Sequence, residues 1–325
     1  MFRESCVPGA GPGEIAGRRT DDDTNYPLPP GLGRFPLRHV DDFADKVSAR
    51  WLQHGGIMLP MYQSEALWVN FTTRYGRGEY PFAVKIATGK INAVSGEEWQ
   101  NGLHRDPQDY LVAPNQPWLD GYCVERGIIR QFVAMPLGAG YTAEEQLTGK
   151  AEHGGLQILV CPMKADVYAR LFEPREELKA HSVYDLCSAA CEASYDMGLA
   201  PGGRMRQQIF EDPYDLQDWD TRHAARCFVH LANSLVWRQI TGSNPPTCPF
   251  TAAEYEAHGL PWFEYYDESA KAVAGADRLS GMKSVRTMGA AKGDVPLPEN
   301  EPVTPQRVIE LRRHLKKDQV RETVF

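Results

Sequence analysis

The segment over residues 108–164 constrains the fold most, because it alternates short apolar runs with turn residues. Residues 122–124 and 128–135 are apolar runs separated by a turn, the spacing of a β-hairpin. Residues 156–160 predict a further strong strand. Several short strands punctuated by Gly, Pro and Asn favour an antiparallel sheet over alternating β-α-β units.

The regions around this segment divide the chain into three parts. Residues 1–34 are rich in Gly, Pro and charge, so they cannot offset the entropy of ordering, and we expect a flexible or loosely wrapped arm. Residues 35–165 are expected to form a β-rich half, which begins with a helix over 40–52. From residue 166 the apolar period becomes 3.6, which predicts a helical half over 166–325 that packs on the sheet.

The strongest helix is predicted over 220–240. Its apolar positions recur at helical spacing, and Gly242 is a suitable stop. Further helices are expected over 166–172, from about residue 264 and from about residue 304. The fold class is therefore α+β, with an antiparallel β-sandwich or barrel-like sheet packed against a C-terminal helical region.

The net charge and the spacing of the cysteines indicate which partners and which cellular location to expect. A net charge of −8 argues against a nucleic-acid-binding surface, which needs a basic excess. No run of about 18 apolar residues exists, and the N-terminus lacks the apolar core of a signal peptide, so no membrane partner is expected. The seven cysteines are scattered without a CxxC pair, which favours reduced thiols and a cytoplasmic location.

One candidate site lies on the helix predicted over 220–240. His223, Cys227 and His230 share a helix face at the spacing HxxxCxxH, and Asp220 leans the same way. Imidazole and thiolate are ligands for zinc or another divalent metal, and a Cys–His pair also suits nucleophilic catalysis. The alternative is that these residues pack against the neighbouring sheet, since a mid-helix cysteine lacks an N-terminal dipole to lower its pKa.

A second candidate site lies in the β-rich half. Trp118, Asp120, Arg130, Gln131 and Glu145 combine carboxylates, polar groups and an aromatic ring, as in sites for sugars or for acid–base chemistry. Arg130 and Gln131 are adjacent within an apolar strand, so one of them must point inward and requires partners. The alternative is turn chemistry and exposed sheet-face pairs.

Other motifs carry less weight. Residues 138–143 match GxGxxA, but the following helix is too short for a dinucleotide-binding unit, which favours a glycine loop. The carboxylates over 204–220 lack the spacing of an EF-hand and are better explained as a solvated loop.

Five segments resemble those of a group of uncharacterised bacterial and fungal proteins. The resemblance implies that the sheet and the helical region form one unit from about Pro30 to the end, and it implies no catalytic residues. The segments are QDYLVAPNQPWLDG, IRQFVAMPLGAGYTAEEQLTG, FVHLANSLVWRQITG, GLPWFEYY and LKKDQVRETVF.

Three functions are consistent with these patterns. The first is a cytoplasmic binding or interaction protein whose β-rich half engages a small molecule, a sugar or a protein. The second is a metal-assisted or Cys/His-based enzyme with its site where the 220–240 helix meets the sheet. The third is a structural protein that self-assembles, and a homo-oligomer is compatible with all three.

Overall fold

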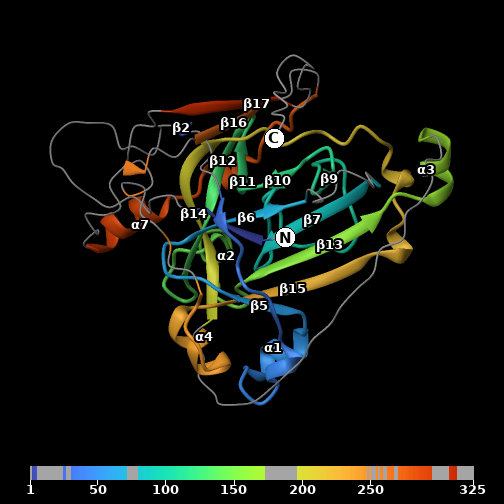
Figure 1. Ribbon diagram of the computed structural model, residues 1–325. Coiled ribbons are helices and arrows are strands. Elements are labelled where there is room, and N and C mark those ends of the chain that lie inside the picture. Colours follow the sequence, from blue (N-terminus) through green and yellow to red (C-terminus); the bar gives the residue numbers. More distant parts are fainter. Residues whose placement is uncertain are drawn as a thin grey trace, which may run out of the picture.

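The computed structural model describes residues 2–5, 25–26, 31–71, 80–172, 196–246, 249, 254, 257–258, 262–266, 270–294 and 307–312. Its main body is a 15-stranded, mostly antiparallel sheet (Figure 1). The main path runs β3-β1-β6-β12-β14-β15-β13-β7-β8 and does not close into a barrel. The predicted α+β class with an antiparallel sheet is therefore confirmed.

The strands of this sheet range from two to eleven residues. They are β1 (Phe2–Ser5), β2 (Asn25–Tyr26), β3 (Gly31–Gly33), β4 (Arg38–His39), β5 (Ile57–Pro60), β6 (Ala66–Asn70), β7 (Phe82–Thr88), β8 (Ile91–Asn92), β9 (Leu111–Ala113), β10 (Trp118–Leu119), β11 (Gly121–Glu125), β12 (Ile128–Pro136), β13 (Leu156–Pro162), β14 (Asp196–Arg206) and β15 (Ala225–Ala232). A separate parallel pair is formed by β16 (Trp262–Tyr266) and β17 (Val308–Arg312).

Short helices flank the sheet. The α-helices are α1 (Ala49–His54), α2 (Ala143–Thr148), α3 (Ala165–Leu171), α4 (Ser234–Thr241), α6 (Asp277–Ser280) and α7 (Val285–Lys292), and the 3-10 helices are η2 (Asp41–Phe43), η3 (Leu216–Asp218) and η4 (Thr221–His223). No helix among the described residues has the length and apolar character to cross a membrane.

Strands β7, β13 and β15 form the ladder that positions the site. Gln157 of β13 lies opposite Phe228 of β15 on one side and Ala87 of β7 on the other. Because side chains alternate along a strand, Leu156 and Val229 point to the other face, where they join the main hydrophobic core. One face of the ladder is thus apolar and buried, and the other carries polar and aromatic groups.

Helices α1 and α4 lie at one end of this ladder, beside β5 (Figure 1). Ser48 begins α1 by accepting a hydrogen bond from the Trp51 amide, and Gly55 ends it. A hydrophobic cluster joins α1, α4 and the strands. Its members are Val40, Phe43, Val47, Trp51, Met58, Ala232, Val236, Trp237 and Ile240.

The prediction of a single helix over residues 220–240 is wrong. Residues 225–232 form β15, and a helix begins only at Ser234. Asn233 separates the two, because its side chain accepts hydrogen bonds from the Leu235 and Val236 amides as an N-cap. The apparent helical period came from reading a strand and the following helix as one element.

Other element predictions have mixed outcomes. The helix over 166–172 is confirmed as α3, and the one over 40–52 is divided into η2 and α1. The helices expected near residues 264 and 304 are wrong where the structure describes them, because β16 and β17 are strands. The sequence also predicts a helix over residues 183–195 that carries Cys187 and Cys191, and this segment lies outside the described residues.

The predicted division into an arm, a β-rich half and a helical half does not hold for the sheet, which contains strands from all three parts. Strands β14 and β15 come from the half predicted as helical, yet they lie at the centre of the same sheet as β12 and β13. Strands β1, β2 and β3 come from the predicted arm and pair with β6, β14 and β1, respectively. The sheet therefore recruits short segments from most of the chain.

Candidate functional site

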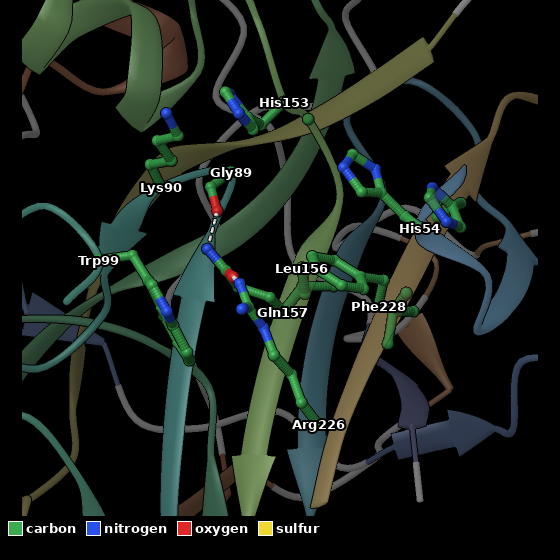
Figure 2. A pocket seen from close by; sticks show the side chains of 12 residues that line it. His54, Gly89, Lys90, Trp99, His153, Leu156, Gln157, Arg226 and Phe228 are labelled. Atoms are coloured by element: carbon green, nitrogen blue, oxygen red, sulfur yellow. Dashed lines mark hydrogen bonds between the residues drawn. The ribbon is translucent and has the colours of Figure 1, made fainter. Parts of the chain in front are cut away.

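A cavity of about 340 Å³ opens on the polar face of the β7–β13–β15 ladder. Figure 2 shows side chains converging on it from the strands and from the loops at their ends. Its lining consists of His54, Gly89, Lys90, Trp99, His153, Gly154, Leu156, Gln157, Arg226, Phe228, Val229 and His230.

Two of these loops depend on glycine for their position. Gly56 has φ +90°, and a Cβ there would lie 2.2 Å from the carbonyl oxygen of Phe228. Gly155 has φ +56°, and a Cβ there would lie 2.4 Å from the carbonyl oxygen of Val229. Only glycine tolerates such an approach together with a positive φ. These contacts fix the end of α1 and the loop before β13 against β15.

The cavity wall is a series of aromatic and cationic groups. His54 stacks on Phe228 with ring centroids 4.8 Å apart, and His230 stacks on Trp51 at 4.7 Å. The Arg226 guanidinium lies 4.7 Å from the ring centroid of Phe228 and 4.7 Å from that of Trp99. Such cation–π contacts hold a guanidinium in place without neutralising its charge.

Gln157 also holds Arg226. Its side-chain amide donates to the Gly89 carbonyl oxygen at 2.7 Å (Figure 2), and its side-chain oxygen accepts a hydrogen bond from the Arg226 guanidinium. Gln157 is buried, so its orientation is set by these two bonds. The pair links the floor of the cavity to the turn that carries Lys90.

The lining is rich in groups that carry or accept positive charge. It contains Lys90, Arg226 and three imidazoles, and no aspartate or glutamate is among its described members. Burial, and secondarily Arg50, His153 and Arg226, lower the pKa of His54. Burial also lowers the pKa of His230 to about 4, although its Nε2 donates to the Gly55 carbonyl oxygen at 2.9 Å. A buried imidazole surrounded by cations resists protonation, so the cavity favours a negatively charged occupant.

A buried glutamate lies behind His153. Glu144 of α2 is 3% exposed, and its Oε1 lies 2.9 Å from His153 Nδ1. Its Oε2 accepts hydrogen bonds from the backbone amides of His153 at 3.1 Å and Gly154 at 3.3 Å. Arg50 donates to the His153 carbonyl oxygen at 2.9 Å, so both the backbone and the imidazole of His153 are held.

A buried lysine supports the opposite wall. Lys85 is 1% exposed, and its Nζ donates to Asp109 Oδ2 at 2.5 Å and to the carbonyl oxygens of Gln100 and Gly102. All three ammonium protons therefore have acceptors. The same ammonium lies 5.0 Å from the ring centroid of Trp99. Lys85 thus orders the loop that presents Trp99 to the cavity.

The predicted Asp220, His223, Cys227 and His230 constellation does not assemble. Cys227 and His230 lie on β15 three positions apart, so their side chains point to opposite faces of the strand. His223 is exposed and its Nδ1 bonds to Asp220 Oδ2 at 2.7 Å, at the far end of the strand. Burial raises the pKa of the Cys227 thiol, which disfavours the nucleophilic thiolate. Within the described segments, no group of three or more His, Cys, Asp or Glu residues is arranged to hold a metal.

His230 alone of that set lines the cavity.

The predicted ligand-binding residues of the β-rich half are occupied by internal contacts. Asp120 is 2% exposed and bonds to the side chains of Trp118 and Gln207, and its burial raises its pKa to about 7. Gln131 is fully buried, and Arg130 is buried with its Nη1 donating to the Gly202 carbonyl oxygen at 3.3 Å. Trp118 and Asp120 do come together, and neither is part of the lining of the cavity on the β7–β13–β15 ladder.

Glu145 has a structural role. It completes a capping box at the start of α2, where its carboxylate accepts hydrogen bonds from Thr142 and from the Gly140 amide at 2.6 Å. The 138–143 glycine loop is therefore the entry to a six-residue helix. The neighbouring Glu144 is the one that reaches the cavity histidine, His153.

Sequence reasoning also missed His54, Lys90, Trp99 and Arg226. A signal existed in the paired glycines Gly55-Gly56 and Gly154-Gly155, since such pairs mark places where backbones approach closely. Comparison of the chain with protein-family models, curated proteins and solved structures found no match.

Proposed function

We propose that the protein binds a small organic anion with a planar apolar part in the cavity between α1 and the β7–β13–β15 ladder. The observation that carries this proposal is the lining of Lys90, Arg226 and three imidazoles without a described carboxylate. It retains a ligand-binding role for the chain but moves the site away from Trp118 and Asp120.

The charge of the cavity favours an anion. The guanidinium of Arg226 is held by Gln157, Trp99 and Phe228, and none of these partners neutralises it. A preorganised guanidinium binds carboxylate or phosphate with little loss of side-chain entropy. Lys90 is exposed at the rim and adds a second permanent positive charge.

The size and the aromatic walls favour a small, planar ligand. A volume of about 340 Å³ falls at the lower end of the range for small-molecule sites. Trp99 and Phe228 each present a ring close to Arg226, and rings of this kind stack on planar groups. An arylcarboxylate or an aryl-substituted oxo acid meets both requirements.

The three cysteines within the described residues, Cys123, Cys161 and Cys227, are unpaired, which supports the proposed cytoplasmic setting.

Isothermal titration calorimetry with phenylpyruvate tests the proposal. We expect binding by the wild-type protein and no binding of phenylacetone, which keeps the ring and the ketone but lacks the carboxylate. Arg226→Met should weaken phenylpyruvate binding by about tenfold or more, because it removes a charged hydrogen-bond donor worth about 1.5–3 kcal/mol.

Arg222→Met is the matched control. Arg222 lies four residues earlier, its side chain is 84% exposed, and it is not part of the cavity lining. Its substitution should leave the affinity unchanged. Absence of phenylpyruvate binding to the wild-type protein, or equal losses in the two variants, would contradict the proposal.

A further inference from the structure

We propose that the cavity is also a proton-transfer site, in which His153 interconverts the keto and enol forms of a bound 2-oxo carboxylate. This inference rests on the proposed binding of an organic anion. It adds a reaction, a substrate class and a catalytic residue to that binding function.

The geometry around His153 leaves one ring nitrogen for chemistry. Nδ1 lies 2.9 Å from Glu144 Oε1, and a carboxylate oxygen accepts a hydrogen bond, so Nδ1 carries the proton. The other ring nitrogen, Nε2, then has the lone pair of a base. A carboxylate behind a histidine both fixes this tautomer and stabilises the imidazolium formed when the base takes a proton.

The position of Glu144 is fixed by the backbone that it binds. Its Oε2 accepts from the amides of His153 and Gly154, and Gly89 packs against the same oxygen so closely that a Cβ there would lie 2.5 Å away. Gly89 also leads into Lys90. The glutamate, the histidine and the turn bearing Lys90 therefore form one contiguous unit at the cavity wall.

The cavity contains cations that stabilise the negative charge developing on the substrate during the reaction. When a proton leaves the carbon next to a carbonyl group, negative charge appears on the carbonyl oxygen. Lys90 and Arg226 line the same cavity as His153 and supply the positive charge that stabilises an enolate. The substrate carboxylate and the enolate oxygen carry two negative charges, which equal in number the positive charges of Lys90 and Arg226.

The reaction needs no further reagent. His153 Nε2 takes a proton from the carbon next to the keto group, the C–H electron pair becomes a carbon–carbon π bond, and the carbonyl π pair moves to oxygen. The same proton then passes from the imidazolium to the enolate oxygen, which gives the enol and restores neutral His153. The reverse sequence returns the proton to carbon.

Proton NMR in deuterated buffer with phenylpyruvate tests the inference through exchange of the methylene protons. We expect wild-type protein to accelerate this exchange above the buffer rate and His153→Gln to reduce the acceleration at least 100-fold, since general base catalysis contributes 10²–10⁴-fold. Calorimetry should show that His153→Gln still binds phenylpyruvate within about threefold of wild type, because Lys90 and Arg226 remain.

His223→Gln is the matched control for nonspecific catalysis by surface imidazoles. His223 has a side chain that is 75% exposed and also bonds to a carboxylate, that of Asp220, but it lies outside the cavity lining. Its substitution should leave the exchange rate unchanged. Binding without accelerated exchange, or equal losses in the two variants, overturns this inference alone, whereas absence of binding overturns the proposed function as well.

Glu144 is a positioning residue, and its role predicts a kinetic signature. Glu144→Gln should lower kcat at least tenfold with little change in KM, because an amide can donate to Nδ1 and leave Nε2 protonated. An unchanged kcat would contradict this role. If circular dichroism shows that Glu144→Gln does not fold, Glu144→Asp, which keeps the carboxylate, should retain more exchange activity than His153→Gln.

Discussion

Two polar clusters lie in the same sheet and differ in how their charges are satisfied. Around Asp120, buried polar side chains bond to one another, as Trp118 and Gln207 do to the carboxylate. Around the cavity, Arg226 and Lys90 have no carboxylate beside them among the described lining residues, and burial and neighbouring cationic groups lower the pKa values of His54 and His230. The polar groups of the first cluster are satisfied within the protein, and the second cluster is suited to a ligand.

Residue type alone therefore does not identify a binding site. The sequence predicts a binding site where carboxylates lie next to an aromatic ring, yet in the structure the partners of these carboxylates lie within the protein. The cavity groups are less concentrated along the chain and come together only through the sheet.

The largest effect is expected at the lysine beneath Trp99. Lys85→Met leaves the buried Asp109 carboxylate without its ammonium partner, and breaking such a pair costs about 3–5 kcal/mol. Urea denaturation should show this loss of unfolding free energy. A loss below about 1 kcal/mol would show that the pair does not support the loop carrying Trp99.

Asp120 should make stability depend on pH. Its folded-state pKa is raised from 3.8 to about 7, so the folded protein binds more protons between these values and stability falls as pH rises through that window. About three pKa units correspond to an upper limit of about 4 kcal/mol. Asp120→Asn should flatten the curve between pH 4 and 7.

Unfolding free energies of wild type and Asp120→Asn at pH 5 and pH 8 measure this effect. The wild-type protein should lose more stability than the variant between the two values. Equal losses of unfolding free energy in the two proteins would contradict the raised pKa of Asp120 as the source of the pH dependence.

Anion binding at the cavity should strengthen as pH falls. His54 has a lowered pKa because of burial and the charges of Arg50, His153 and Arg226, and a bound anion offsets those charges and favours its protonation. We expect the Kd for phenylpyruvate to fall about threefold to fivefold from pH 7.5 to 5.5, equivalent to roughly 1 kcal/mol. His54→Asn should reduce that dependence, and an identical pH profile in the variant would exclude His54 as its source.

The smallest effect is expected at His223. Its imidazole is exposed and pairs with Asp220 outside the cavity, and surface pairs of this kind contribute little to stability. His223→Ala should leave Tm and phenylpyruvate affinity unchanged within error. A clear loss of affinity would mean that the far end of β15 takes part in binding.

The sequence predicts individual strands and hairpins better than it predicts which segments of the chain join the sheet. The hairpin of β11 and β12 and strand β13 follow from alternation and turn residues that lie together in the chain. Strand β15 was missed because its apolar residues and those of α4 happen to recur at helical spacing. Asn233 marks the boundary between them, but an asparagine within an amphipathic pattern is a weak signal without its hydrogen bonds.

The candidate site was less predictable for a physical reason. His230 was selected, but for a metal cluster that requires a helix, and a strand sends Cys227 to the other face. His54, Trp99 and Arg226 are brought together by strand pairing and close backbone contacts that no local pattern encodes. Such positions are fixed by tertiary structure alone.

The hydrogen bond between His230 and the Gly55 carbonyl oxygen joins residues 175 positions apart in the chain. Closing a loop of this size is among the slower and more cooperative events of folding, because the entropy must be lost before the contacts are gained. The cavity lining spans residues 54–230, so no segment shorter than this span contains all of it. A ligand of this cavity would act as a probe of global folding, stabilising the native chain by RT ln(1 + [L]/Kd) and leaving partly folded forms unaffected.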